Sequence, residues 1–436
     1  MFYSKVCEDT YQMSDNLPND RLFEGIWPTP NGVSVNAYLI EGADKYALID
    51  GSTSWTGGLK KFKSDDGVEW DSLIESICEV DNSFEELKEV FKANNLDEKK
   101  IGYVIINHME PDHSSWIESM YKINPDIEVY ISERGSHILD SFYSFKEKVN
   151  VVKDGDKLDI GNGHVLTFYE IPNVHWPDTM VTFDEKTGVV FACDAFGSYG
   201  AVDENNYDDL LSEEKIRFYE DEAIGYYSNI VASFSTFVQR ALAKLGGLPV
   251  KIIAPGHGIV WRKNPERVIK LYEELASYQA GPAKEEITLI WGSMYGMTER
   301  AVKTAIETLE ETGIKYHVHN VPETEIGEIL KSCWTSTGVI LAMPTYEYNM
   351  FPPMANVLDE LGKKKVQNRK AFRFGSFGWS GGAEKELKEI TERRKMNWEF
   401  LPSVEFKGIP TDGEKEAVRE RILDLVAAVR ADVRDK

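Results

Sequence analysis

The stretch that most constrains this chain is INHMEPDHSSW, residues 106–116, which overlaps the end of the apolar run 103–107. Two histidines, a glutamate and an aspartate lie between positions 108 and 113, with Pro111 separating two pairs. His108 and Glu110 are two residues apart, so extended backbone directs both side chains to one side. Pro111 breaks the strand, and the turn presents Asp112 and His113 as a second pair. One loop can therefore hold two ligands for each of two adjacent metal ions.

Three later segments offer the further ligands that two metal ions require. Each lies just beyond an apolar run and beside proline or glycine, which is typical of rigid loops at strand ends. The candidates are His175 in PNVHWPDTM, Asp194 in FACDAFGSYG and His257 in APGHGIVW. A carboxylate such as Asp194 can bridge two cations, and mixed nitrogen and oxygen ligation suits iron, manganese or zinc. The other histidines are interpreted as ordinary core or loop residues: His137, His164, His317 and His319.

Together these residues resemble the ligand set of the metallo-β-lactamase fold, an αββα sandwich. The zinc hydrolases of that fold carry His-x-His-x-Asp-His, followed by a later His, Asp and His. Glu110 stands in place of the second histidine, and this departure is shared with the flavodiiron proteins. In parts of the family, the residue at the position of His113 is not a direct ligand. The resemblance implies two iron ions, one held by His108, Glu110 and His175, the other by Asp112, His113 and His257, with Asp194 bridging.

Composition narrows the class of protein. The net charge of -24 and the sequence pI near 4.9 argue against binding to nucleic acid or to an anionic membrane. We find no secretory signal and no run of about eighteen apolar residues that would span a bilayer. The cysteines are scattered and form no CxxC pair, at Cys7, Cys78, Cys193 and Cys333. We therefore expect a cytoplasmic protein without a disulfide framework and without a fused iron–thiolate module.

A candidate linker divides the chain at ASYQAGPAKEE, residues 276–286, where Gly281 and Pro282 are typical of a linker. We predict one domain over 1–280 and a second over 286–436. Beyond the linker, strand-like runs alternate with helical ones, which predicts a doubly wound parallel sheet. The last helix is expected near 413–431. The charged stretch at 60–71 is predicted to be an insertion or a surface loop.

The second domain carries three loops that suit a flat phosphorylated ligand. WGSMYGMTER, residues 291–300, is neither a dinucleotide fingerprint nor a nucleotide P-loop. Its hydroxyl groups and backbone N–H groups suit a phosphate monoester at a helix N-terminus. Two later loops combine aromatic residues with glycine turns, which can sandwich a flat ring. The candidates are Ser293, Met294, Tyr295, Gly296, Met297 and Thr298 in the first loop, Thr345, Tyr346, Tyr348 and Asn349 in the second, and Ser376, Trp379, Ser380, Gly381 and Gly382 in the third.

The segment 287–436 resembles flavodoxin, an FMN carrier, and its three loops match the phosphate loop and the two isoalloxazine loops of that family. A lactamase-like domain followed by a flavodoxin-like domain resembles the flavodiiron proteins over nearly the whole chain. The resemblance implies FMN, two non-haem iron ions and an oxidoreductase that reduces O2 to water, NO to N2O, or both. It also implies a rubredoxin-like electron donor and a head-to-tail homodimer or tetramer.

Several alternatives remain open from the sequence. A dinuclear zinc hydrolase fused to a flavodoxin-like domain is the main competitor, and Glu110 argues against it. A flavin shuttle with an inert lactamase-like half is the other, and the complete ligand set argues against that. Tyr199 lies five residues after Asp194 and is either a proton donor near the metals or a packed aromatic residue. The metal ligands themselves do not rank O2 against NO.

Overall fold

The computed structural model describes residues 1–17, 19, 22–52, 60–63, 69–72 and 85–435. The chain divides into two compact units. The first contains Met1–Tyr226 and Thr236–Tyr272, and the second contains Tyr227–Ser235 and the residues from Glu273 onward. The predicted domain limits were 1–280 and 286–436. The first unit instead ends at Tyr272, and the segment Tyr227–Ser235 belongs to the second unit.

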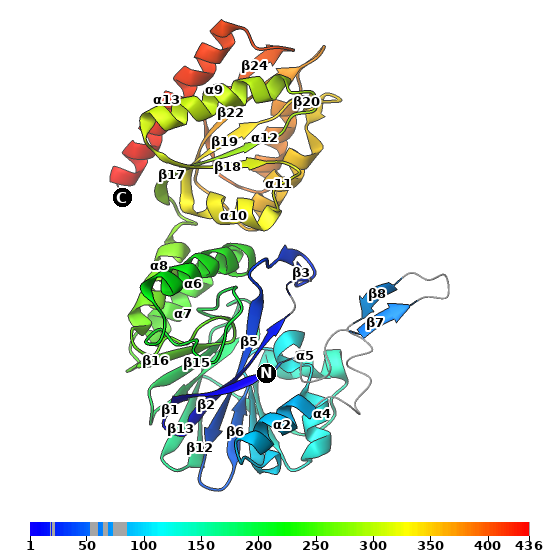
Figure 1. Cartoon of the computed structure of the whole chain (residues 1–436), viewed down its shortest axis with the longest axis vertical. Coiled ribbons are helices and arrows are strands. Elements are labelled where there is room, and N and C mark those ends of the chain that lie inside the picture. The colour runs from blue at the N-terminus through cyan, green and yellow to red at the C-terminus, as the bar shows by residue number, and fades with distance from the viewer. Residues whose placement is uncertain (18, 20–21, 53–59, 64–68, 73–84, 436) are drawn as a thin grey trace. The chain divides into compact units, whose positions relative to one another are not determined.

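Two β-sheets form the centre of the first unit (Figure 1). The first sheet is β1 (Phe2–Cys7), β2 (Thr10–Leu17), β5 (Val33–Glu41), β6 (Tyr46–Ile49), β9 (Ile101–Ile106), β10 (Glu128–Ser132) and β11 (Val149–Val152), in that spatial order. The second is β12 (Lys157–Gly161), β13 (His164–Glu170), β14 (Met180–Asp184), β15 (Val189–Cys193) and β16 (Ile252–Pro255).

Alternating side chains explain how the first sheet is buried on both faces. Leu39 and Leu48 pack with the helices α2 (Glu85–Ala93), α4 (Ile117–Ile123) and α5 (Glu133–Tyr143). Their neighbours Ile40 and Ile49 pack against the second sheet. Helices α6 (Glu213–Tyr226), α7 (Ser235–Leu245) and α8 (Pro265–Ser277) lie beside β15 and β16 (Figure 1). The predicted αββα sandwich is therefore confirmed.

Two short hairpins complete the first unit. One is β3 (Leu22–Phe23) with β4 (Trp27–Pro28), and the other is β7 (Lys60–Lys63) with β8 (Glu69–Ser72). The second hairpin lies where the sequence predicted an insertion or a surface loop, and residues 64–68 are outside the described chain. The two strands pair antiparallel, from Lys60 opposite Ser72 to Lys63 opposite Glu69.

The second unit contains a parallel sheet in the order β18-β17-β19-β22, with β23 and β24 both pairing with β22. This is the flavodoxin-like strand order, so the predicted doubly wound sheet is confirmed. The strands are β17 (Lys284–Trp291), β18 (Lys315–Asn320), β19 (Ser336–Ala342), β22 (Lys370–Phe377), β23 (Glu399–Phe400) and β24 (Val404–Lys407). A small hairpin joins β20 (Thr345–Tyr346) to β21 (Asn349–Met350).

Helices cover both faces of this sheet (Figure 1). On one face lie α9 (Met297–Thr312) and α13 (Asp412–Arg434), and on the other lie α10 (Ile326–Thr335), α11 (Pro352–Lys363) and α12 (Ala383–Arg393). A capping box between Thr411 and Glu414 begins α13. The apolar stripe of α13 is buried: Val418, Ile422, Leu425 and Val429. In the described residues, no helix has the length and apolarity that crossing a bilayer requires.

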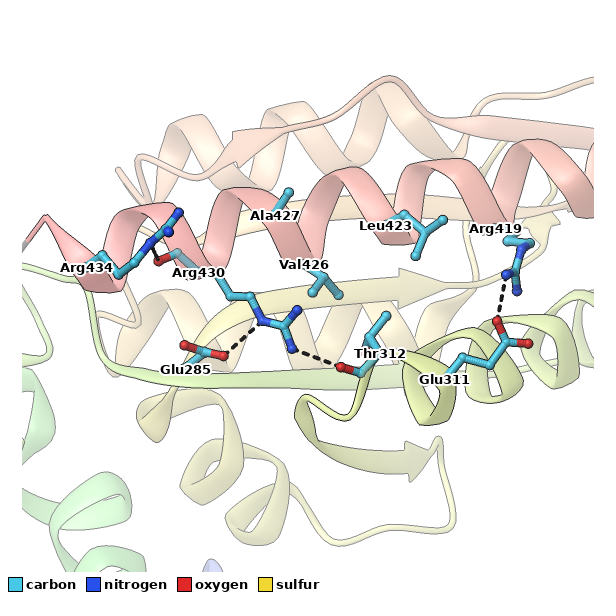
Figure 2. A pocket seen from close by; sticks show the side chains of 9 residues that line it. All are labelled: Glu285, Glu311, Thr312, Arg419, Leu423, Val426, Ala427, Arg430 and Arg434. Atoms are coloured by element: carbon cyan, nitrogen blue, oxygen red, sulfur yellow. Dashed lines mark hydrogen bonds and ion pairs between the residues drawn. The ribbon is translucent and has the colours of Figure 1, made fainter.

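A surface groove of about 620 Å³ runs between α13, the start of β17 and the end of α9 (Figure 2). Its arginines are engaged within the groove itself. Arg430 contacts Glu285 at 3.0 Å and donates to the carbonyl of Thr312 at 2.9 Å, and Arg419 contacts Glu311 at 2.6 Å. These contacts fasten α13 to its neighbours, so we assign the groove a structural role.

Glu286, buried in β17, predicts how the second unit responds to acid. Its carboxylate contacts Lys315 at 2.8 Å and His317 at 2.9 Å, both on β18. Burial alone would raise the pKa of Glu286, but these two partners lower it to about 2. The stabilisation is therefore complete above the ordinary pKa near 4.5 and is lost as the pH falls toward 2, with an upper limit of about 3 kcal/mol.

We expect Glu286→Gln to flatten the loss of stability between pH 5 and pH 3, because glutamine cannot take up the proton. Urea unfolding at a series of pH values measures this slope. Glu285→Gln is the matched control, since Glu285 is half-exposed and pairs with Arg430 on the surface. Equal slopes for the two variants would show that Glu286 does not control the acid response.

Candidate metal centre

The first ligand loop follows β9 directly. Asn107 anchors it, because its backbone N–H and its side-chain amide both donate to the buried carboxylate of Asp50, at 2.8 and 3.2 Å. Burial raises the pKa of Asp50 to about 6. Pro111 ends the extended segment as predicted, and it also begins a one-turn helix, α3 (Pro111–Ser114). This turn carries Asp112 and His113 round toward the residues of the extended part.

One group of donor atoms combines three segments of the chain. The Nε2 atom of His108 lies 3.2 Å from Oε2 of Glu110, and Nε2 of His175 lies 3.0 Å from the same oxygen. Both imidazole nitrogens also face Oδ2 of Asp194, at 3.1 and 3.0 Å. Donors bound at about 2.1 Å to one ion lie about 3 to 3.5 Å apart, so this group has the size of a metal site.

A second group lies beside the first. The Nε2 atoms of His113 and His257 are 3.1 Å apart, and Oδ2 of Asp112 lies 3.6 and 3.5 Å from them. Oδ1 of Asp194 lies 3.1 Å from His113 and 3.2 Å from His257. The structure therefore directs Nε2 of His113 into the cluster, although its equivalent in parts of the family does not coordinate.

Asp194 connects the two groups, with one carboxylate oxygen facing each. This is the arrangement that the sequence resemblance implied for the seven candidates. Asp194, His108, His113 and His257 are at most 1% exposed. Within the described chain, neither carboxylate oxygen of the partly buried Asp112 accepts a hydrogen bond. Buried carboxylates normally have a partner, so the orphaned oxygens fit a bound cation.

The electrostatics of the cluster favour charged side chains in spite of their burial. Burial lowers the pKa of His175, but Asp194 and Glu110 outweigh that effect and raise it to about 9. Burial raises the pKa of Asp194, but the neighbouring imidazoles, His108 first, hold it well below its usual range. Burial raises the pKa of Asp112, whereas Glu110 and Asp194 stay anionic, and metal ions would take the place of imidazole protons.

Outer contacts orient the ligands. Nδ1 of His257 donates to the backbone carbonyl of Ser34 at 2.6 Å, which leaves Nε2 free to face the cluster. Oδ2 of Asp178 accepts the backbone N–H of Met109 at 2.8 Å and lies 3.5 Å from Nδ1 of His108. Sequence reasoning missed both outer residues. Asp178 had a signal, because it lies three residues after His175, whereas the carbonyl of Ser34 had none.

Aromatic side chains line the His257 side of the cluster. The buried ring of Phe23, in the β3–β4 hairpin, lies 5.4 Å from the ring of His257, and the ring of Tyr226 lies 5.5 Å from it. Tyr199, predicted as a proton donor or a packed aromatic, is 5% exposed and contacts Phe23 and Tyr226 edge-on. This packing favours the structural interpretation of Tyr199. The thiol of Cys193 also lies within 4.8 Å of donor atoms of His113 and Asp194.

The loop before α9 has the features of a phosphate site. Gly296 is the N-cap residue with φ of 78°, and its N–H donates to the hydroxyl of Ser293 at 3.0 Å. The hydroxyl of Thr298, in the first turn, is 3.0 Å from that of Ser376, which brings the first and third loops together. Hydroxyl groups and the positive end of a helix are suited to a phosphate monoester.

The other two loops expose aromatic rings at the carboxyl ends of the strands. Trp379 is 75% exposed and Tyr348 61%, and their rings meet edge to face at 6.5 Å. Tyr295, in the first loop, is 84% exposed. A Cβ atom on Gly382 would lie 2.0 Å from the carbonyl oxygen of Tyr348, so only glycine lets the second and third loops approach. Exposed rings around a glycine turn fit a flat aromatic ligand.

Comparison with known proteins places these two sites in one family. A model described as ODP family beta lactamase matches residues 79–258. The anaerobic nitric oxide reductase flavorubredoxin of Escherichia coli O1:K1 / APEC is 33% identical over 333 residues, which cover 75% of this chain and 67% of that protein.

Solved structures match both units. A variant of the flavo di-iron protein of Thermotoga maritima is 29% identical with a TM-score of 0.82, over 98% of this chain and 99% of that one. The rubredoxin oxygen:oxidoreductase of Desulfovibrio gigas has a TM-score of 0.85 over 99% and 100% of the two chains, and its 24% identity supports the fold alone. With a curated relative above 30% identity and both units matched in solved structures, the chain belongs to the flavodiiron protein family.

Proposed function

We propose that this protein is a flavodiiron oxidoreductase that reduces O2 to water, NO to N2O, or both, at a non-haem iron pair supplied with electrons by FMN. The observation that carries the proposal is the position of Asp194, whose two carboxylate oxygens face two separate groups of three candidate ligands. The 33% identical relative supports the same reaction class, since it is named a nitric oxide reductase.

Glu110 favours iron over the zinc of the related hydrolases. A carboxylate is a harder donor than the imidazole found at that position in zinc hydrolases, and mixed oxygen and nitrogen ligation suits iron. The relatives also disfavour the alternative of a zinc hydrolase, because their names describe an oxidoreductase or a di-iron protein. The convergence of all seven candidate ligands argues against an inert lactamase-like half.

The residues of the chain have distinct roles in this proposal. An iron pair and a flavin supply electrons to a bound diatomic gas, singly or in pairs. His108, Glu110 and His175 would hold one iron, while Asp112, His113 and His257 would hold the other, with Asp194 shared between them. The carbonyl of Ser34 and the carboxylate of Asp178 fix the direction of two of these imidazoles.

The three loops of the second unit would hold FMN. Ser293, Thr298 and the first N–H groups of α9 would bind the phosphate, and Thr298 also contacts Ser376 of the third loop. Tyr348 and Trp379 supply exposed rings against which the flavin can stack. The turn at Gly381 and Gly382 would offer backbone amides to the edge of the ring.

The partners and the location are parts of the same proposal. Family membership supports an external redox protein as electron donor, and we propose a rubredoxin-like one. We also propose a head-to-tail homodimer or tetramer, which would bring the flavin of one subunit against the iron pair of another. Cys7, Cys193 and Cys333 are free thiols, which fits a reducing cytoplasm.

The direct test is anaerobic reduction of the purified protein, followed by rapid mixing with O2 and, separately, with NO. We expect two iron ions and one FMN per chain, and the flavin absorbance to return with at least one gas, because the iron pair passes electrons to the gas. A protein that contains two zinc ions and reacts with neither gas would refute the proposed function and favour a hydrolase.

We expect His175→Ala to lower the iron content from about two to about one per chain or less, and the gas reductase activity by about 100-fold or more. The reason is that the side chain of His175 lies within 3.0 Å of both Glu110 and Asp194. His137→Ala, at an exposed position of α5, is the matched control and should keep wild-type iron. Metal analysis measures both variants, and equal iron contents would contradict the assignment of His175.

We expect Gly382→Ala to weaken FMN binding by about tenfold or more, because the new methyl group would collide with the carbonyl of Tyr348. Gly378→Ala is the matched control in the same loop, since a Cβ atom there has nothing within 4 Å. Flavin fluorescence during titration of the flavin-free protein measures both affinities. Wild-type affinity in Gly382→Ala would show that this turn does not shape the flavin site.

A further inference from the structure

A small cavity in the first unit lies behind the metal-binding loops. Its lining includes Val174 and Ala195, each from a loop that carries a candidate ligand, and Ala241 and Leu242 of α7. The cavity leaves about 10 Å³ for the centre of a water-sized sphere, which is about the room that one such sphere needs. It therefore has the size for one very small molecule.

The chemistry of the lining is apolar. The remaining lining residues are aliphatic or aromatic, including Phe196 and Tyr272, whose rings lie 5.0 Å apart. The hydroxyl of Tyr272 is already committed, because it donates to the carbonyl of Gly197 at 3.0 Å. A water molecule needs two or more polar partners, whereas an apolar cavity stays dry and takes up nonpolar gases. The lining thus selects against water and in favour of a gas.

The position of the cavity relates it to the metal ligands. Val174 precedes His175 in the chain, and Ala195 follows Asp194. Phe196 has φ of 67°, a left-handed conformation that is unusual for a bulky residue and holds its ring against Tyr272. Among the lining residues, only Leu242 is partly exposed, so it marks the side nearest to solvent. The cavity thus extends from α7 to the backbone that positions two ligands.

We propose that this cavity is a docking site for the diatomic gas on its way to the metal centre. The ligand class is a small, uncharged, nonpolar gas such as O2 or NO. The inference rests on the proposed function, since only a gas-consuming enzyme would use such a site. In this proposal Ala241 and Leu242 control the access of the gas, and neither residue is a candidate metal ligand.

Krypton under pressure is a test that does not depend on activity, because krypton reports apolar cavities directly. Crystals of the holoprotein should show krypton between Val174 and Ala241, and crystals of Ala241→Leu should not. Ala243→Leu is the matched control, because it adds the same side chain at an exposed position of α7 and should keep the krypton. Leu242→Ala widens the cavity and should raise the occupancy, which provides a second variant if Ala241→Leu does not fold.

Rapid mixing of the reduced holoprotein with dissolved O2 or NO tests the function of the cavity, because it measures the rate of reaction with the gas. We expect the second-order rate constant to fall by about fivefold or more in Ala241→Leu and to stay at the wild-type value in Ala243→Leu, while iron and FMN contents are unchanged. Absence of krypton from both wild type and Leu242→Ala, or a wild-type rate in Ala241→Leu, would overturn the inference. Krypton in the cavity of a protein that reacts with neither gas would refute the proposed function and leave the apolar site standing.

Discussion

The structure of the first unit depends on the cost of burying charge. Three carboxylates and four imidazoles converge in two adjoining groups, and Asp194, which faces both groups, is 1% exposed. Isolated ionised groups would be strongly destabilising there, so each needs a counter-charge. Protons on the imidazoles of His108, His113 and His175 meet that need in the metal-free cluster, and cations would meet it when metal is bound. The cluster is therefore stable only if the surrounding backbone holds every member in place.

The αββα sandwich supplies that rigidity by ending its strands at the cluster. The ligand loops follow β9, β13, β15 and β16, so a buried sheet fixes the start of each loop. Additional polar contacts brace the loops from behind, as Asp50 does for Asn107 and Ser34 for His257. The candidate ligands lie on the loops and the sheets supply the packed core, as is usual in enzymes.

The sequence brought the candidate metal ligands together before the fold was known because their signal is local. Each candidate follows an apolar run beside proline or glycine, and strand ends in a sandwich lie close together, so seven residues from four segments could be assembled before any geometry was known. The outer contacts were out of reach for a physical reason. The carbonyl of Ser34 is a backbone group, which no residue type reveals. Asp178 lies close to His175 in sequence, but its contact is with His108, a pairing that only the fold establishes. The segment Tyr227–Ser235 was missed likewise, because its grouping with the second unit depends on tertiary contacts rather than on local pattern.

The two candidate sites differ in exposure to solvent: the metal cluster is buried, whereas the loops of the second unit expose aromatic rings. The metal cluster needs charges excluded from water, so its side chains are held by a closed sandwich and lined by Phe23 and Tyr226. The flavin loops need open rings for a large flat ligand, so Tyr295 and Trp379 stay exposed at strand ends, held by glycine turns rather than by a core. A gas, in contrast to an electron, must physically enter the largely buried metal cluster. Because water is the competitor for that entry, an apolar lining is the simplest means by which the chain can admit O2 or NO and still keep the buried charges dry.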